Sequence, residues 1–388
     1  MQFGKAIRGE WLLDDDIIFL NHGSFGACPK RVLDVQRGWQ EQLEREPVRF
    51  FLREMPQALE SVKEQLSQFI GAKAEDVVFV ENATMGFNAV LRSLAPTFKP
   101  GDELLTTSHV YGAIRKTMQY IADTTGAKVV EISVPFPISD AQEVVDAIEA
   151  AITPKTRFAL IDHITSPTAV IYPLERIIPM LKQRGILVMI DGAHVPGMID
   201  LDIESLGADF YTGNCHKWLF APKGSAFLWV DKKHQSNIHP TLISHKYKKG
   251  YQEEFGWTGT WDPSAWLSIG AGIDFFNTLG AENIRSYTHS LLLDAREKLT
   301  KGLDVGYGAP EEMLGMICTV LLPNDPSGAE QYILDLHNKL FDAYHIEVPA
   351  MTTNGTAYIR FSTHVYNDAS EYDALLAALQ TEFRGGVS

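Results

Sequence analysis

Cysteine is scarce in this chain of 388 residues, which contains only Cys28, Cys215 and Cys318. Because their number is odd and they lie far apart, the sequence predicts neither a disulfide framework nor a zinc site, and no metal is expected. We interpret all three as reduced, partly buried thiols. Cys215 is of special interest because it lies two residues before Lys217, a lysine with a candidate chemical role.

Positive charge and long apolar runs are also lacking. The formal net charge is −15 and no run is rich in lysine or arginine, which argues against nucleic acid or an anionic membrane as a partner. No stretch reaches the roughly 18 apolar residues of a membrane span, and the start of the chain has no apolar signal core. The sequence therefore predicts a soluble protein of the cytoplasm.

Internal repeats and low-complexity linkers are absent as well. A chain of 388 residues exceeds the roughly 250–300 residues at which a single core stops growing, so more than one domain is expected. Strand and helix patterns alternate along the first two thirds of the chain and lose this rhythm from Ala265 onward. We expect an N-terminal arm (1–30), a large domain (31–262) and a smaller C-terminal domain (263–388), with a loop at 244–256.

The most informative stretch is an apolar run, Leu187–Asp191, that ends in an acid. Such a run is typical of a buried parallel strand, which would deliver Asp191 to the edge where open α/β sheets bind ligands. A second short segment carries His216 and Lys217 toward the same edge. A lysine at that place can form a Schiff base with a cofactor, and an acid can protonate a pyridine nitrogen. This pairing indicates a pyridoxal phosphate enzyme.

Three motifs in this order resemble class V aminotransferases of fold type I, and more narrowly their isopenicillin N epimerase-like branch. They are Asp-Gly-Ala-His at 191–194, the pair His216-Lys217, and Pro-Lys-Gly at 222–224. The spacing of 26 residues from Asp191 to Lys217 is close to that of the family.

The resemblance extends over nearly the whole chain, from the turn-rich string at 20–26 to the strand pattern at 358–362. It implies an α/β fold with a mainly parallel seven-stranded sheet flanked by helices, and a smaller α+β C-terminal domain. It also implies pyridoxal 5'-phosphate as the cofactor, with Lys217 as the Schiff-base lysine and Asp191 beneath the pyridine nitrogen.

The phosphate of the cofactor is expected at the start of a helix. Asn82, Ala83 and Thr84 form a turn into a helical pattern, where backbone N–H groups carry partial positive charge, although such a turn alone is more often a simple cap. The resemblance adds His216 as a phosphate contact. It also implies that Thr260 reaches a neighbouring subunit's phosphate, which predicts a homodimer with shared active sites.

The resemblance assigns further side chains to the cofactor ring. A planar side chain after the strand pattern at 103–107 should lie against the pyridine ring, with His109 as first choice and Tyr111 as second. His194 is expected to contact the cofactor from the loop after Asp191. His163, at the end of another strand pattern, takes the place of a family asparagine, and an ordinary loop histidine is an equal alternative.

Arg360 matches the arginine with which the family binds a substrate carboxylate. A guanidinium suits this role because its planar fork can hold a carboxylate through two hydrogen bonds, while a structural salt bridge is the alternative. Asn21 and His22 lie in the arm that the family folds over the mouth of the site, and they are predicted to contact the substrate. A plain surface turn is the alternative for this arm.

These residues predict an enzyme that acts on the α-carbon of an amino acid, with three reactions open. β-Elimination from a cysteine derivative ranks first, epimerisation second and transamination third. A cysteine desulfurase is disfavoured because Cys318 lies in a strand pattern rather than on a C-terminal loop.

Two hypotheses from other classes are weaker. A non-catalytic regulator with this fold would be favoured by loss of Lys217, Asp191 or Arg360, and all three are present. A nicotinamide-dependent dehydrogenase needs a glycine-rich turn after an early strand, and residues 81–86 do not provide one.

Overall fold

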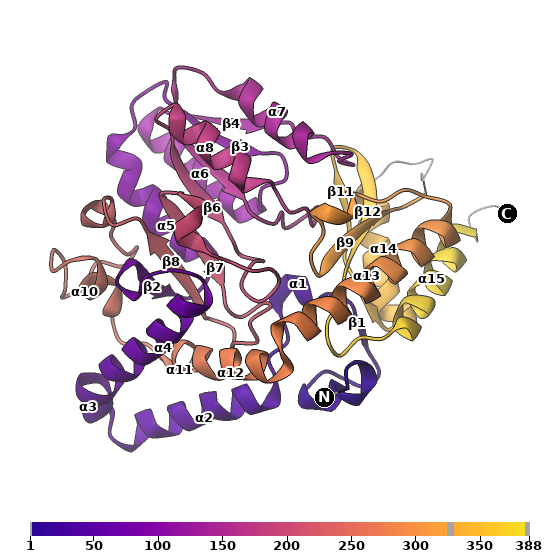
Figure 1. Cartoon of the computed structure of the whole chain (residues 1–388), viewed down its shortest axis with the longest axis horizontal. Helices are drawn as coiled ribbons and strands as arrows, with labels where there is room; N and C mark the ends of the chain where they lie inside the picture. Colours follow the sequence, from indigo (N-terminus) through magenta and orange to yellow (C-terminus); the bar gives the residue numbers. More distant parts are fainter. Residues whose placement is uncertain (1, 324–329, 385–388) are drawn as a thin grey trace.

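A seven-stranded sheet forms the centre of the larger part of the molecule (Figure 1), and the computed structural model describes residues 2–323 and 330–384. In order across the sheet, the strands are β2 (Val77–Val80), β8 (Ala226–Val230), β7 (Phe210–Asn214), β6 (Leu187–Asp191), β5 (Thr156–Asp162), β3 (Glu103–Thr107) and β4 (Lys128–Ile132). β8 runs antiparallel to both of its neighbours, and the remaining pairs are parallel. The predicted fold class is confirmed.

Side chains of the sheet point alternately to two apolar layers, as the two-residue period of a strand requires. In β6, Val188 and Ile190 join one core cluster while Met189 joins the other. The second cluster includes side chains of α5 (Ala83–Leu94) and α6 (Gly112–Thr125). The first includes α4 (Met55–Phe69), α7 (Ala141–Ala151) and α8 (Leu174–Gln183). Helices therefore cover both faces, which explains why β6 is apolar throughout until Asp191.

The C-terminal part of the chain builds a smaller antiparallel sheet, in the order β11 (Ala350–Thr353), β12 (Thr356–Ser362) and β9 (Ile317–Leu321). Its helices are α13 (Ala281–Leu303), α14 (Glu330–Tyr344) and α15 (Ala369–Arg384). Two helices that precede them, α11 (Ser264–Leu267) and α12 (Ile269–Leu279), contact α4 and α2 (Lys30–Arg45) of the larger part. The shorter helices are α1 (His22–Phe25), α3 (Pro47–Arg49), α9 (Ile203–Leu206) and α10 (Tyr251–Gly256).

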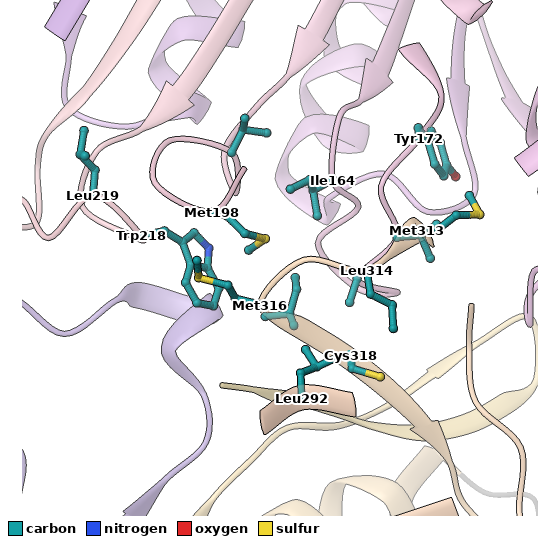
Figure 2. Close-up of a cluster of buried hydrophobic side chains, with 14 of the residues drawn as sticks. Ile164, Tyr172, Met198, Trp218, Leu219, Leu292, Met313, Leu314, Met316 and Cys318 are labelled. Carbon is teal, nitrogen blue, oxygen red and sulfur yellow. The ribbon is translucent and has the colours of Figure 1, made fainter. Parts of the chain in front are cut away.

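Apolar side chains from both parts of the molecule meet in one continuous cluster (Figure 2). Ile164 and Trp218 come from loops at the edge of the large sheet, whereas Leu292 belongs to α13 and Cys318 to β9. All four side chains are buried. This packing holds the small sheet against the edge of the large sheet where β6 and β7 end.

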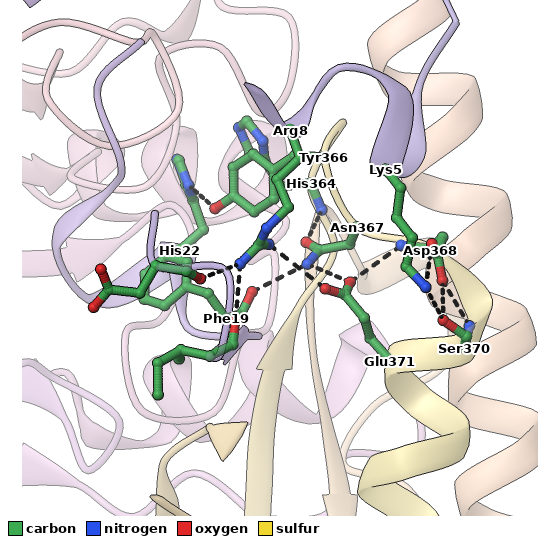
Figure 3. Close-up of polar contacts among 12 residues, drawn as sticks. Lys5, Arg8, Phe19, His22, His364, Tyr366, Asn367, Asp368, Ser370 and Glu371 are labelled. Atoms are coloured by element: carbon green, nitrogen blue, oxygen red, sulfur yellow. Dashed lines mark hydrogen bonds and ion pairs between the residues drawn. The ribbon is translucent and has the colours of Figure 1, made fainter. Parts of the chain in front are cut away.

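The N-terminal arm is fastened to the C-terminal part of the chain (Figure 3). β1 (Ile18–Phe19) pairs in parallel with β10 (Ile346–Glu347). The Arg8 guanidinium lies 3.6 Å from the carboxylate of Glu371, and the Asn367 amide donates to the carbonyl of Phe19 at 3.1 Å. These contacts place α1 between the two sheets.

One predicted loop is partly wrong, because residues 251–256 form the short helix α10. Tyr251 and Phe255 of this helix are buried in the second core cluster, so tertiary packing stabilises a segment without a clear apolar period. Within residues 2–323 and 330–384, no helix has the length and apolar character needed to cross a bilayer.

Asp209 connects the starts of β6 and β7. Its side chain is buried, and it accepts hydrogen bonds from the Val188 N–H at 2.9 Å, from His234 Nε2 at 2.8 Å, and from Lys182. Lys233 Nζ lies 3.0 Å away. Burial by itself would raise the pKa of this carboxyl, but the hydrogen bonds from His234, Lys182 and Val188 outweigh burial, and the pKa lies well below its usual value.

We expect Asp209→Asn to lower the free energy of unfolding at pH 7 by about 1–3 kcal/mol, because the charged hydrogen bonds are lost. The folded-state pKa is depressed, so this contribution is present above the unfolded value of about 3.9 and is lost as the pH falls through the folded value. Urea denaturation across this pH range measures it. Asp34→Asn, in an exposed ion pair with Arg37, is the control, and equal losses in the two variants would contradict the prediction.

Candidate active site

A cavity of about 860 Å³ opens where the strands of the large sheet end and the small sheet meets them. Asp191 ends β6, Lys217 follows β7, and Arg360 belongs to β12 of the small sheet. All three line this cavity together with the first residues of α5. Residues 169 positions apart in sequence, Asp191 and Arg360, therefore meet in one site.

Lys217 is almost completely buried, with 9% of its surface exposed. Its Nζ lies 3.0 Å from Nε2 of His194. Burial lowers the pKa of the amine to about 7, and the charge of Arg360 acts in the same direction while Asp191 opposes it. A large share of the amine is therefore uncharged near neutral pH, which is the form that attacks a carbonyl carbon.

Asp191 is held by the backbone of the next loop, since the Ala193 N–H donates to its Oδ1 at 2.9 Å. Burial raises the pKa of this acid to about 6, although the hydrogen bond from Ala193 and the charge of Lys217 lower it. Above this pH the carboxylate can pair with a cationic group in the cavity.

Asp162 is a neighbour of Asp191 that sequence reasoning did not single out. The two residues pair in register across β5 and β6, so their side chains leave the same face of the sheet. Both carboxyl oxygens of Asp162 are buried without a hydrogen-bond partner in the described structure. Burial and the neighbouring charge of Asp191 raise the pKa of Asp162 well above its usual value, which favours its uncharged form.

Two predicted histidines also line the cavity. His194 lies between Lys217 and the indole of Trp218, whose Nε1 donates to His194 Nδ1 at 3.3 Å. His216 is fixed by a hydrogen bond of 2.9 Å between its Nδ1 and the carbonyl oxygen of Ser225. Burial lowers the pKa of both rings, to about 4 for His216, so both are neutral at pH 7.

The first turn of α5 also lines the cavity, with Asn82, Ala83 and Thr84. The Asn82 side chain acts as a helix cap and accepts from the Met85 N–H at 3.0 Å. Asn214, at the end of β7, accepts from the Ala83 N–H at 2.9 Å. Among the described hydrogen bonds of this turn, none uses the Thr84 N–H. Thr84 therefore supplies a donor for an anion at a positive helix end.

The structure does not bring His109 or His163 into the lining of this cavity. His109 is buried and its Nδ1 contacts the Thr168 hydroxyl at 3.0 Å, whereas Tyr111 lines the cavity. The geometry thus favours the second choice. His163 turns to the other side of the sheet, where its Nδ1 lies 3.0 Å from the Tyr211 hydroxyl, and Ser166 faces the cavity from the same loop.

Asn21 and His22 also lie outside the cavity lining. The His22 ring is fully buried and bonds with the Tyr366 hydroxyl at 2.8 Å, as Figure 3 shows, and with the Lys217 carbonyl oxygen at 2.9 Å. Asn21 Oδ1 accepts from Ser24 and lies 3.4 Å from Arg360 Nη2. Both residues therefore contact Arg360 or Lys217 from outside the cavity. The sequence predicted instead that they would contact the substrate.

Arg360 is oriented by two other residues. Its Nη2 donates to Ser24 Oγ at 2.9 Å, and its Nη1 donates to the carbonyl oxygen of Ser166. Ser24 and Phe25 face the cavity from the string in which Asn21 and His22 were singled out. The sequence pattern thus indicates a segment that reaches the cavity, but it does not specify which of its side chains point inward. Thr260 is exposed and is not part of this chain's own cavity lining.

Known proteins are similar to this chain over nearly all of its length. "Probable L-cysteine desulfhydrase, chloroplastic" of Arabidopsis thaliana is 32% identical over 96% of this chain and 84% of its own. Isopenicillin N epimerase of Amycolatopsis lactamdurans is 31% identical over 96% of this chain and 97% of its own. A cysteine desulfurase of Thermococcus onnurineus NA1 has the same fold, with a TM-score of 0.81 at 22% identity over 99% of both chains.

The model of the aminotransferase class-V family matches residues 27–375, which include the acid, the lysine and the arginine of the cavity. The sheet order, the buried lysine and the full-length relatives agree with this match. The chain therefore belongs to the class V aminotransferase family of pyridoxal phosphate-dependent enzymes.

Proposed function

We propose that this protein is a pyridoxal phosphate-dependent C–S lyase that carries out β-elimination on a cysteine derivative. One observation carries the proposal: a single cavity combines the buried amine of Lys217, the acid of Asp191 and the guanidinium of Arg360, and contains no cysteine. The relative named as a desulfhydrase supports the same reaction class.

The residues of the cavity fit the proposed cofactor. Lys217 would hold it covalently, Asp191 would face its ring nitrogen, and the Thr84 N–H at the positive end of α5 would face its phosphate. Tyr111 would cover the ring. When bound, pyridoxal phosphate supplies an electron sink for the negative charge that remains at an amino acid's α-carbon after bond cleavage.

The residues of the chain then divide the remaining work. Arg360 binds the substrate carboxylate through its planar fork and so fixes which bond at the α-carbon is presented to Lys217. The Lys217 Nζ, with a pKa of about 7, removes the α-proton and carries it within the cavity. Asp191 keeps its negative charge above pH 6 and favours a protonated ring nitrogen. In the net reaction the Cα–H and Cβ–S bonds break, the sulfur leaves as a thiol or sulfide that takes up the proton, and the unsaturated amine that is left reacts with water to give pyruvate and ammonia.

The positions of the thiols separate this proposal from a desulfurase. A desulfurase needs a reactive cysteine that accepts sulfur from the substrate, whereas a lyase releases the sulfur compound. Cys28, Cys215 and Cys318 are all buried, and none lines the cavity. Burial raises the pKa of Cys28 and Cys318 to about 12, and that of Cys215 as well, so the thiols are protonated and poorly nucleophilic.

Epimerisation is the second candidate function, because the epimerase of Amycolatopsis lactamdurans aligns over 97% of its own length. It would use the same α-proton removal but return the proton to the opposite face. Transamination stays a third alternative, and a non-catalytic protein with this fold is the least favoured.

We also propose that the protein is a homodimer with shared active sites and that it is located in the cytoplasm. We further propose that each chain consists of an N-terminal arm that ends at residue 30, a large domain that ends at residue 262, and a smaller C-terminal domain. A groove of about 570 Å³ lies outside the active site and is lined by apolar side chains that include Phe51, Leu52 and Trp257. Leu242 and Ile243 are exposed in the same segment of the chain as Thr260. Burial of such side chains against a second copy would be favourable, and it would bring Thr260 toward the partner's site.

The first test is a panel of L-cysteine, S-substituted cysteines and other L-amino acids, with pyruvate, ammonia and the change in chirality measured. A lyase should release pyruvate and ammonia in equal amounts from the cysteine derivatives only. Lys217→Ala should abolish product and also the cofactor label that borohydride reduction fixes to the protein. Lys223→Ala, six residues later and exposed, should keep both. Racemisation without pyruvate would favour the second candidate.

Tyr111→Ala is expected to weaken cofactor binding several-fold, because loss of an aromatic contact costs about 0.5–1.5 kcal/mol. Tyr111 is 49% exposed, so the variant should fold normally. Equilibrium dialysis against pyridoxal phosphate gives the dissociation constant. Tyr120→Ala on α6, at 48% exposure, is the matched control. Equal affinity in both variants would remove Tyr111 from the ring contact.

Arg360→Lys should reduce kcat/KM by about 30-fold or more, since loss of a desolvated guanidinium–carboxylate pair costs about 2–5 kcal/mol. An ammonium keeps the charge but cannot form the same fork. The absorption spectrum of the cofactor should be unchanged. Arg115→Lys, in a half-exposed ion pair with Glu131, is the control. A loss in Arg115→Lys and none in Arg360→Lys would move the carboxylate site to Arg115.

Mixing two inactive variants tests the shared site. Lys217→Ala and Thr260→Trp should each be inactive as homodimers, because one lacks the amine and the other blocks the donated hydroxyl. After subunit exchange, a heterodimer with one intact site should regain up to about half of its activity per dimer, by the simple count of sites. No recovery, with exchange verified by native mass spectrometry, would count against sharing.

A further inference from the structure

Lys217, His194 and Trp218 form a buried chain of polar contacts. The indole Nε1 of Trp218 donates to His194 Nδ1 at 3.3 Å, and His194 Nε2 lies 3.0 Å from Lys217 Nζ. His194 and Trp218 are each 1% exposed. The His194 ring thus connects the indole to the amine, with one ring nitrogen facing each.

The chemistry of the indole decides the arrangement of protons. An indole N–H can donate a hydrogen bond and cannot accept one, so His194 Nδ1 must be the acceptor. A neutral imidazole carries its single proton on the other nitrogen, here Nε2. Nε2–H then donates toward Lys217, and only an uncharged amine has the lone pair to accept it. A charged Lys217 would require Nε2 to accept, which would place the ring proton on Nδ1, directly against the indole N–H.

We propose that Trp218 is a positioning residue that fixes His194 in the tautomer with its proton on Nε2 and thereby holds Lys217 as an uncharged nucleophilic amine. This uncharged state belongs to Lys217 as a free amine, whichever amino acid reacts. Only the catalytic advantage of this state rests on the proposed function: a neutral Lys217 can bond to the cofactor and accept a proton from the substrate.

The other charged and titratable groups around the triad divide into two sets. A charge on Lys217 and the charge of Arg360 from β12 disfavour a charge on His194, and protonation of His22 from α1 or of His216 would act in the same direction. Arg360 also disfavours a charge on Lys217, whereas Asp191 favours it. Burial acts most strongly on both groups, and the pKa of His194 lies well below its usual value. The surroundings therefore keep His194 neutral, and only a neutral ring carries a single proton that can reside on Nε2.

Other side chains pack against the face of the Trp218 indole that points away from His194. This packing keeps the indole directed toward His194. Trp218 lies in the buried apolar cluster of Figure 2, and its ring is 4.8 Å from that of His22. His22 in turn bonds to the Lys217 carbonyl oxygen. The arm thus holds the indole from one side while the loop after β6 holds the imidazole from the other.

The test measures the protonation of Lys217 in the full chain after bound aldehyde is removed by dialysis against hydroxylamine. Formaldehyde and cyanoborohydride label uncharged amines, and peptide mass spectrometry follows Lys217 as a function of pH. In Trp218→Phe, His194 can move its proton to Nδ1 and accept from a charged Lys217. The apparent pKa of Lys217 should rise by about one unit from its value of about 7, so labelling at pH 7 should fall about fivefold.

Trp229→Phe is the matched control, because Trp229 is also buried but its Nε1 has no hydrogen-bond partner in the described structure. It should leave the Lys217 profile unchanged, even if both variants lose thermal stability. A folded Trp218→Phe protein with the wild-type Lys217 profile would overturn the proposal.

A second measurement needs no change at Trp218. Nitrogen-15 NMR of histidine-labelled wild-type chain distinguishes the two tautomers, and the signal missing from His194→Asn identifies His194. A proton on Nε2 supports the proposal, and a proton on Nδ1 or on both nitrogens overturns it. Both measurements are made without substrate. They therefore test the state of Lys217 and His194 independently of the proposed lyase activity, and an absence of that activity would leave their result unchanged.

Discussion

The burial of the Lys217 amine is the constraint on which the rest of the site depends. Burial removes the water that stabilises a charged ammonium. The ammonium therefore releases its proton more readily, and the pKa of Lys217 falls to about 7. The charge of Arg360 also lowers this pKa, and the neutral imidazole of His194 contacts the amine. The charge of Asp191 raises the pKa and so limits its fall. The protein thereby keeps an amine that is nucleophilic near neutral pH and can still hold a proton.

The fold produces this burial through the edge of a parallel sheet. β5, β6 and β7 end side by side, and their last residues include Asp162, Asp191 and Asn214. Apolar layers on both faces leave the strand ends as the place where polar side chains can gather. Asp209 fastens β6 to β7 at their opposite ends and so sets the register that aligns Asp191 with Thr212.

The small sheet and the N-terminal arm complete the site from the other side. Arg360 reaches the cavity from β12, the middle strand of the small sheet, and this sheet packs against the large sheet through the cluster in Figure 2, to which β9 contributes Cys318. Ser24 and the Ser166 carbonyl then hold its guanidinium. His22 bonds to the backbone of Lys217, so the arm positions the lysine as well as the arginine. The wall of the cavity and the contacts that hold Lys217 are thus one connected structure.

The sequence alone determined the fold class and the family, and it singled out Lys217, Asp191 and Arg360, which the structure brings to one cavity. An apolar strand that ends in an acid and an ordered set of motifs are local features. Only the tertiary structure decided which neighbours face the cavity. Tyr111 and Ser166 line it, while His109 and His163 do not, since a loop's turn decides which side chains point inward. The raised pKa of Asp162 and the contact of Trp218 with His194 depend on burial and on partners distant in sequence, which no local pattern records.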